Sequence, residues 1–582
     1  MTTSDGHVKW VCRDHYRASY QEKHTQALRD VVKLTQGEFD EQLGRITIAL
    51  GSSFAATEFY NAVNQAKGVI ELTVDLNWSC VRGDFEALGN ALRKSRVSIL
   101  RLCLREAFQT SRLQSTSAQY KALFHIGQLP RMKLFHIDLP EDTVKLPSFK
   151  PKNQPLCKLS VNLSPVSLGE KEYRTLVETL KVNSTLTTLN LQKNNIGVNG
   201  AMALAEVLKT NSALFTLNLY NNSIGDNGAV ALSEALKTNS TLTTLDLQIN
   251  KIGDNGAVAL AEAIKTNSTL TTLDLESNSI GSDGAVALAE TLKTNSTLTT
   301  LDLQESKIRD NGAKALAEAL KANSTLITLD LRDNSIGSDG ANALAEALVV
   351  NSTLITLNLN GNSILFKGFL ALSETLKKNS ILTAFDLLCG TSTAKTMFEA
   401  LKADSTLTTL NLRYASIGSD GAKEVAEALK TNSALTTLDL LHNSIASDGA
   451  KALAEALKTN STLTTLDLGR NSIGYDGAKA LAEVLKINST LNTLDLQESK
   501  IGDNGAKALA EALKANSTLT TLDLKDNSIG SDGAKALAEA LKTNSTLITL
   551  DLRYNSIGSD GANALTEALK TNSILTALDY NV

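Results

Sequence analysis

The stretch LTTLDLESNSIGSDGAVALAETLKTNST spans residues 270–297, and a new LTTLDL follows at once at residues 298–303. Nearly the same 28-residue phrase recurs over about two thirds of the chain. A fixed period of this length indicates a solenoid, in which each repeat is one supersecondary unit that buries its apolar face only by stacking on its neighbours. The whole chain is therefore best understood through this repeat.

The first half of each repeat predicts a short strand. Leu270, Leu273, Leu275 and Asn278 fit the pattern L-x-x-L-x-L-x-x-N, in which alternate side chains of the strand are buried. Asn278 stands where the chain leaves the strand. We expect its buried amide to satisfy backbone groups that no neighbouring strand reaches.

The second half of each repeat predicts a helix over residues 282–295. The apolar residues Ala285, Leu288 and Leu292 recur at helical spacing. Ser282 and Asp283 are the residue types that cap helix N-termini, and Asn295 is a type that tolerates the left-handed conformation closing a helix. Strand and helix therefore alternate once per repeat.

The motif resembles the leucine-rich repeats of the ribonuclease-inhibitor type, which are also found in NOD-like receptors and in the Ran GTPase-activating protein. The resemblance covers roughly residues 158–582. It implies an α/β solenoid, a right-handed leucine-rich-repeat horseshoe with a parallel β-sheet on the concave face and α-helices on the convex face. Because unrelated activities share this scaffold, the resemblance is specific for fold and much less so for function.

The repeat extends in degenerate form toward the N-terminus. Residues 45–157 carry alternating apolar residues at intervals that predict further strands, with a helix over residues 53–65. Residues 1–44 are expected to form a helical cap over the first repeat. The predicted organisation is thus a cap at 1–44, degenerate repeats at 45–157 and regular repeats at 158–582.

One repeat breaks the period. The last leucine of each strand recurs every 28 residues from Leu191 to Leu552, except between Leu387 and Leu412, where the step is 25. The missing three residues fall in the loop between strand and helix, where CGTSTAK replaces a stretch such as NSIGSDGAK. We interpret this change as a tolerated deletion, with a weak point or an altered binding surface as the alternative.

Composition narrows the class of protein. The net charge of −5 gives no support for nucleic-acid or membrane binding, and the five cysteines show no paired spacing. The polar N-terminus lacks the apolar core of a signal peptide, and no segment approaches the length of a membrane span. These features predict a cytoplasmic protein that acts as a monomer without a cofactor.

Two strand positions are expected to face a partner on the concave side. The first is threonine in most repeats, and the second is acidic in most repeats. Carboxylates one strand apart reinforce each other's negative potential, so a protein with a basic surface is the natural partner. The alternative is that both residues were copied with the repeat. The acidic positions are Asp246, Asp274, Asp302, Asp330, Asp386, Asp439, Asp467, Asp495, Asp523 and Asp551.

The two positions after each strand vary between repeats that are otherwise nearly identical. Tyrosine and arginine, the types enriched at interface hot spots, occur there repeatedly. Neutral drift on an exposed surface is the alternative explanation. The predicted partner-binding residues are Tyr220, Glu276, Arg332, Asp333, Arg413, Tyr414, His442, Arg470 and Tyr554.

No catalytic or metal motif is evident. The chain has no G-x-x-x-x-G-K-[ST], G-x-S-x-G, H-E-x-x-H or paired C-x-x-C. Cys12, His15 and His24 lie close together but lack a second pair of ligands, so we expect no metal site.

The predicted function is a non-enzymatic protein-protein interaction module or scaffold that holds a protein partner on its concave face, with receptor-like sensing or signalling as one possible role. Two alternatives remain open at this stage. The resemblance to the Ran activator implies a GTPase-activating protein, although no functional residue of that family can be placed on this sequence. The acidic face suggests an inhibitor that captures a basic enzyme.

Overall fold

The computed structural model describes residues 25–35, 37–41, 43–65, 69–77, 80–104, 126, 129, 134–139, 158–163, 177, 180–181, 186–386 and 391–580. The chain divides into two compact units, Met1–Asn278 and Ser279–Val582. Cys12, His15, His24 and most of the proline-rich segment at 130–155 lie outside the described residues.

The first unit begins with a helix at residues 25–34 and a short strand, β1 (Glu38–Asp40). β1 pairs antiparallel with β2 (Arg45–Leu50), whereas the pairs that follow are parallel. A strand at this point of the expected helical cap was not predicted from the sequence. The remaining elements are α2 (Ser53–Gln65), β3 (Glu71–Leu76), α3 (Arg82–Lys94), β4 (Ile99–Cys103), β5 (Leu134–Leu139), β6 (Lys158–Leu163), β7 (Leu186–Asn190), α6 (Gly197–Leu208), β8 (Thr216–Asn218), α7 (Gly225–Leu236), β9 (Thr244–Asp246), α8 (Asp254–Ile264) and β10 (Thr272–Asp274).

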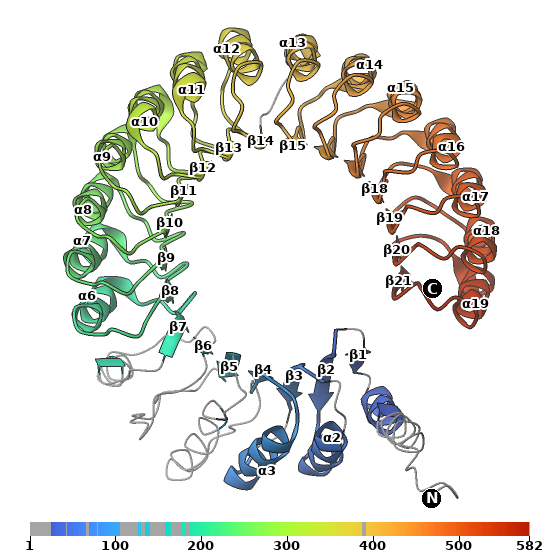
Figure 1. Cartoon of the computed structure of the whole chain (residues 1–582), viewed down its shortest axis with the longest axis horizontal. Helices are drawn as coiled ribbons and strands as arrows, with labels where there is room; N and C mark the ends of the chain where they lie inside the picture. Colours follow the sequence, from blue (N-terminus) through green and yellow to red (C-terminus); the bar gives the residue numbers. More distant parts are fainter. Residues whose placement is uncertain are drawn as a thin grey trace, which may run out of the picture. The chain divides into compact units, whose positions relative to one another are not determined.

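The second unit alternates helix and strand throughout its described residues (Figure 1). Its strands are parallel and pair one repeat with the next, with equivalent leucines side by side, as for Leu301 and Leu329. The elements are α9 (Ser282–Leu292), β11 (Thr300–Asp302), α10 (Arg309–Ala322), β12 (Thr328–Asp330), α11 (Ser338–Val350), β13 (Thr356–Asn358), α12 (Phe366–Leu376), β14 (Ala384–Asp386), α13 (Thr391–Leu401), β15 (Thr409–Asn411), α14 (Gly418–Leu429), β16 (Thr437–Asp439), α15 (Ala446–Leu457), β17 (Thr465–Asp467), α16 (Gly474–Leu485), β18 (Thr493–Asp495), α17 (Gly502–Leu513), β19 (Thr521–Asp523), α18 (Ser531–Leu541), β20 (Thr549–Leu552), α19 (Gly558–Leu569) and β21 (Ala577–Tyr580).

These elements confirm the α/β solenoid predicted from the repeat. Within each unit the strands form one layer and the helices another (Figure 1). The strand leucines and the alanines and leucines of the helices fill the space between the two layers. In the degenerate region, α2 has the bounds predicted from the sequence, and β2 to β6 contain the predicted apolar alternation. The horseshoe curvature remains a prediction.

The strand-end asparagine has the role expected of it. Asn443, which is fully buried, donates from Nδ2 to the Leu412 carbonyl of the preceding repeat at 2.7 Å, and its Oδ1 accepts from the Ile417 N–H at 3.2 Å. Equivalent asparagines repeat these bonds along the stack. In each of these repeats one side chain therefore satisfies backbone groups in loops that no strand pairing reaches, whereas Ala415 occupies the equivalent position after β15.

The predicted helix caps were wrong. No side chain of its own first turn caps α9, and the Ser282 hydroxyl instead donates to the Ile308 carbonyl of the next repeat. In α18 the cap comes from the preceding repeat, because Asp503 Oδ1 accepts from the N–H groups of Gly530 and Gly533, both at 2.7 Å. A carboxylate one helix away can reach these N–H groups because neighbouring helices pack closely at their first turns.

The prediction that an asparagine closes each helix in the left-handed conformation was also wrong. Asn323 and Asn351, which occupy this position after α10 and α11, are extended, with φ of −76° and −71°. Their side chains explain why asparagine is used. Asn323 Nδ2 donates to the Leu292 carbonyl at the end of the preceding helix, and its Oδ1 accepts from the Leu326 N–H at 2.8 Å.

The short repeat keeps its place in the sheet. β14 and β15 pair in register, with Phe385 opposite Leu410, although the chain between them is three residues shorter than elsewhere. The deletion therefore falls between strand and helix, as predicted. Residues 387–390 of that loop lie outside the described residues.

Candidate functional site

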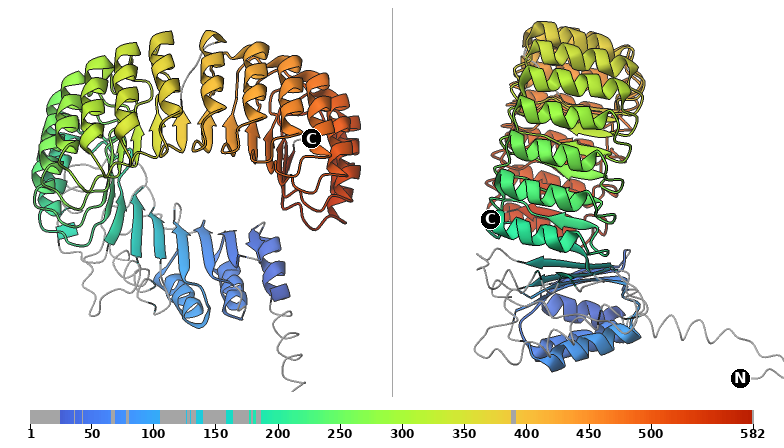
Figure 2. Two further views of the ribbon diagram at one scale, coloured as in Figure 1. Left: turned by 45° about the horizontal axis from the view of Figure 1, so that its top comes forward. Right: turned by 90° about the vertical axis from the view of Figure 1, so that its left-hand side faces the viewer.

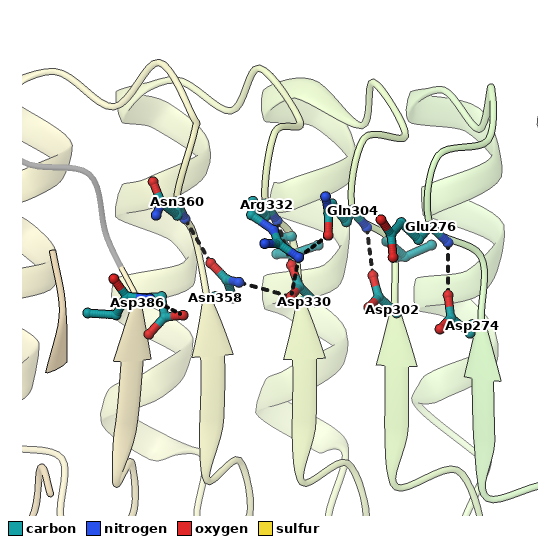
Figure 3. A network of polar contacts seen from close by, with 12 residues as sticks. Asp274, Glu276, Asp302, Gln304, Asp330, Arg332, Asn358, Asn360 and Asp386 are labelled. Carbon is teal, nitrogen blue, oxygen red and sulfur yellow. Dashed lines mark hydrogen bonds and ion pairs between the residues drawn. The ribbon is translucent and has the colours of Figure 1, made fainter. Parts of the chain in front are cut away.

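At the carboxyl end of the strands, the side chain of the last polar residue accepts a hydrogen bond from the backbone of the loop that follows. In the second unit, Asp302, Asp330 and Asp495 each accept a hydrogen bond on Oδ1 from the N–H two residues later, at 2.8–2.9 Å. Figure 3 shows this arrangement repeated from strand to strand. Asn358 makes the same bond to the Asn360 N–H at 3.0 Å. Aspartate and asparagine thus share one structural role here, which favours the view that this residue was retained with the repeat.

The aspartates also form a row of half-buried carboxylates. Burial, together with the neighbouring carboxylates of Asp467 and Asp523, raises the pKa of Asp495 to about 7. For Asp467 and Asp386 the same two causes, burial first, raise the pKa to about 6. Asp495 is therefore only partly ionised near neutral pH, so the negative potential around it is weaker than a count of aspartates suggests.

Arginines reduce the negative potential of the row further, at Asp330 through Arg332 and at two other places. Arg413 forms an ion pair with Asp439 and places Nη2 3.6 Å from Asp467. At Asp551, burial is outweighed by hydrogen bonds from Arg553, which hold the pKa of this carboxyl below its usual value. Asp495, on a strand between those that precede Arg413 and Arg553, forms no ion pair with another described residue.

The second variable position after each strand has a left-handed backbone. Tyr414, His442 and Arg470 have φ of 57°, 56° and 56°. Each of their N–H groups donates to a carbonyl of the next repeat, at 3.0, 2.9 and 2.8 Å. This conformation costs about 1–2 kcal/mol in a residue other than glycine, and the bonds between repeats hold it in place. The side chains are consequently exposed on a rigid backbone.

Four predicted residues come together in adjacent repeats. The rings of Tyr414 and His442 are tilted against each other with centroids 5.1 Å apart. Arg470 interacts electrostatically with Tyr414, and its Nη2 donates to Glu498 Oε1 at 2.7 Å. Arg413 precedes Tyr414 and binds the aspartate row. We call the set Arg413, Tyr414, His442, Arg470 and Glu498 the Tyr414 cluster.

The other predicted residues lie apart from this cluster. Lys525 Nζ stands 5.2 Å from the ring centroid of Tyr554, which is 63% exposed. Arg332 donates to Gln304 and lies 3.9 Å from Asp330 (Figure 3). The neighbouring Asp333 is exposed.

Tyr220 and Glu276 belong to the first unit. Lys193 Nζ lies 5.6 Å from the centroid of the Tyr220 ring, and Glu276 donates its N–H to Asp274. Neither residue belongs to a cluster of the Tyr414 kind within the described part of the first unit.

Three contributing residues were not predicted from the sequence. Glu498 orients Arg470, and Lys193 and Lys525 cover tyrosine rings that were predicted alone. A signal existed, because each of these residues lies one repeat from its partner, at the same or the adjacent position. A comparison of the variable positions between neighbouring repeats would therefore have predicted these three pairs.

Comparison with known proteins identifies the repeat. The family model of the NLRC3 LRR domain matches residues 146–499 and, in a second overlapping match, residues 252–582. The chain belongs to this leucine-rich-repeat family. Leucine-rich-repeat domains typically bind proteins, and the fold is generally a non-enzymatic interaction scaffold. None of the helices within the described residues is long and apolar enough to cross a membrane.

Two further comparisons add little to the family assignment. No curated protein matches this leucine-rich-repeat chain. Among solved structures, it is similar to one titled "Leiomodin-1 Actin-Binding Site 2 (ABS2)", with 31% identity over 22% of this chain and 75% of that chain and a TM-score of 0.21.

Proposed function

We propose that this leucine-rich-repeat chain is a non-enzymatic interaction module that binds a protein partner through the strand face of its second unit, with the Tyr414 cluster at the centre of the contact. The observation that carries the proposal is the exposure of aromatic and arginine side chains on a backbone fixed by bonds between repeats. Tyrosine and arginine dominate interface hot spots, and a rigid surface loses little conformational entropy on binding.

The row of aspartates beside the cluster indicates which charge the surface of the partner should carry. Asp495 lies in the same repeat as Glu498 of the cluster and forms no ion pair with another described residue, and burial raises its pKa to about 7. A lysine or arginine from a partner would supply a compensating charge and stabilise the ionised form. The proposed partner therefore presents a basic surface, and its binding should weaken as salt is added.

The test compares capture of proteins by the intact chain and by the variant R413A/Y414A/R470A. A control variant, K458A/K486A, removes two exposed lysines that only pair with glutamates on their own helices. We expect the intact chain and the control variant to bind the same partner with equal affinity. The affinity of the cluster variant for the purified partner, measured by surface plasmon resonance, should be at least about tenfold weaker. Equal affinity of all three proteins for every captured partner would contradict the proposal.

A further inference from the structure

The sequence contains six Asn-Gly pairs, and the structure places one of them apart from the rest. In an Asn-Gly pair the side-chain amide of asparagine adjoins a backbone nitrogen that no Cβ shields, so the two can react to form a ring. Asn360-Gly361 lies in the loop between β13 and α12. The other five pairs lie near the starts of α6, α7, α8, α10 and α17, and they are Asn199-Gly200, Asn227-Gly228, Asn255-Gly256, Asn311-Gly312 and Asn504-Gly505.

The helical pairs are held by packing and by backbone bonds. The glycine of each of these five pairs is buried. The Gly256 N–H donates to Asp226 Oδ1 of the preceding repeat at 3.0 Å, and a Cβ added to Gly312 would lie only 2.8 Å from Ala285 Cβ of the preceding helix. The helices concerned pack against their neighbours in the stack (Figure 2). Ring formation at these pairs therefore requires the helix start to open first.

The Asn360-Gly361 pair is free of these constraints. Gly361 is exposed, and neither residue belongs to a helix or a strand. The Gly361 N–H donates to Oδ1 of Asn360 itself at 2.7 Å, so the glycine nitrogen and the side-chain amide are already in contact. Figure 3 shows Asn360 just beyond the end of β13, where its own N–H meets Asn358. Water and base reach this glycine nitrogen without any opening of a helix.

The surrounding repeat keeps this pair in its arrangement. Gly361 has φ of 68°, and a Cβ at this position would clash with Asp333 Oδ1, so glycine is required here for packing. The Asn360 carbonyl accepts from the Asp333 N–H at 2.9 Å and from Asn362 Nδ2 at 3.4 Å. The turn is thus fixed on the carbonyl side, while the side-chain amide of Asn360 stays beside the glycine nitrogen.

We infer that Asn360-Gly361 is a site of spontaneous deamidation in the folded chain. The Gly361 nitrogen loses its proton to base and bonds to Cγ of Asn360. The bond from Cγ to Nδ2 then breaks, and ammonia leaves with that proton. Water opens the resulting five-membered imide. Cleavage between the glycine nitrogen and Cγ gives aspartate, whereas cleavage between this nitrogen and the main-chain carbonyl carbon of residue 360 gives isoaspartate.

The reaction would change the charge of the strand face where the acidic row is interrupted. Asn358 of β13 pairs in register with Asp330 on one side and Asp386 on the other, so β13 ends in an amide between two carboxylates. Either product adds a carboxylate two residues beyond Asn358. Isoaspartate also adds one carbon to the backbone of a turn whose carbonyl binds the Asp333 N–H.

The test incubates the full-length chain in mildly alkaline buffer and follows its peptides over time by mass spectrometry. Electron-transfer dissociation separates aspartate from isoaspartate. We expect Asn360 to convert at least about tenfold faster than the asparagine of any helical Asn-Gly pair, because helix opening adds to the barrier at those pairs. In urea, where no helix protects them, all six pairs should convert at similar rates.

A matched variant is Asn360→Gln, because glutamine closes the larger ring much more slowly. It should fold, since Gln304 and Gln497 occupy the equivalent position in other repeats. Isoelectric focusing should show an acidic species that accumulates in the parent and not in the variant.

Four results would overturn the inference. These are an unchanged Asn360, equal rates at the six pairs of the folded chain, faster conversion at a helical pair, or an acidic species that accumulates equally in Asn360→Gln. Selectivity for Asn360 that persisted in urea would contradict the structural argument, because the preference would then arise from the local sequence. Since none of these measurements involves a binding partner, their outcome is independent of the proposed function.

Discussion

Asp495 illustrates how a single residue in this array depends on its neighbours. Its backbone bond to the Gln497 N–H, at 2.8 Å, needs only a side-chain oxygen, and asparagine makes the same bond elsewhere in the array. The charge on Asp495 is therefore not required by the fold. It instead costs stability, because burial and the adjacent carboxylates of Asp467 and Asp523 disfavour the ionised form.

We predict that Asp495→Asn changes the pH dependence of stability. The folded-state pKa of about 7 lies above the ordinary value, so the folded state binds the proton more tightly than the unfolded state. The stabilisation that this proton gives is complete below about pH 4 and is lost as pH rises through 7. The variant should match the parent near pH 4 and exceed it by about 4 kcal/mol at pH 8, in urea unfolding followed by circular dichroism, because one pKa unit corresponds to about 1.4 kcal/mol.

A control for this prediction is Asp526→Asn, at an exposed left-handed position that asparagine tolerates well. This variant should keep the pH dependence of the parent. If Asp495→Asn were equally stable relative to the parent at both pH values, the raised pKa would not affect folding.

At the scale of the helix, neighbouring repeats pack so closely at the helix starts that one added methyl group would clash. A Cβ added to Gly533 in α18 would lie 2.7 Å from Asp503 Oδ1, 2.7 Å from Ile529 Cγ2 and 3.0 Å from Ala506 Cβ. Two of these atoms belong to the preceding repeat. The same glycine also donates its N–H to Asp503, so the close approach and the cap depend on each other.

We predict that Gly533→Ala destabilises the protein although alanine is the better helix former. Overpacking costs about 1–3 kcal/mol, which should exceed the gain of about 1 kcal/mol in helix propensity. Gly89→Ala in α3 is the matched control, because the nearest atom to its added Cβ is Ile126 Cγ1 at an ordinary 3.6 Å. The midpoints of thermal unfolding should fall for the first variant and stay equal or rise for the second. A rise for Gly533→Ala would refute the argument.

At the scale of the whole molecule, the hydrogen bonds outside helices and strands link each repeat to the next. Asn443 bonds to Leu412 and Leu441 carbonyls and to the Ile417 N–H, all within one repeat of itself. Stability in such an array is approximately a sum of repeat and neighbour terms, so damage at one point should remain local.

We predict that Asn443→Ala lowers local stability by about 2–3 kcal/mol, since it leaves buried backbone groups without partners. Hydrogen-exchange mass spectrometry should show faster exchange across residues 404–500 and unchanged exchange across residues 45–100. Asn443→Ser should lower the local stability less than Asn443→Ala does. Ser499 occupies the equivalent position in another repeat, and its hydroxyl donates to the Leu468 and Gln497 carbonyls. Uniformly faster exchange in both units would instead indicate that the whole chain unfolds cooperatively.

The sequence by itself determined the repeat, the alternation of strand and helix, the buried leucines and the place of the deletion. It could do so because the burial of one face leaves a periodic pattern that is local to each repeat. The bounds of α2 and the role of Asn278 followed from that pattern, and the solenoid followed from its recurrence.

Only the tertiary structure decided which side chains meet. The cap of α18 comes from Asp503, Arg413 reaches Asp439 and Asp467, and Tyr414 packs against His442, in every case between different repeats. These contacts join residues about one or two repeats apart in the chain, so they depend on how the repeats stack, and a pattern within one repeat carries no information about that stacking.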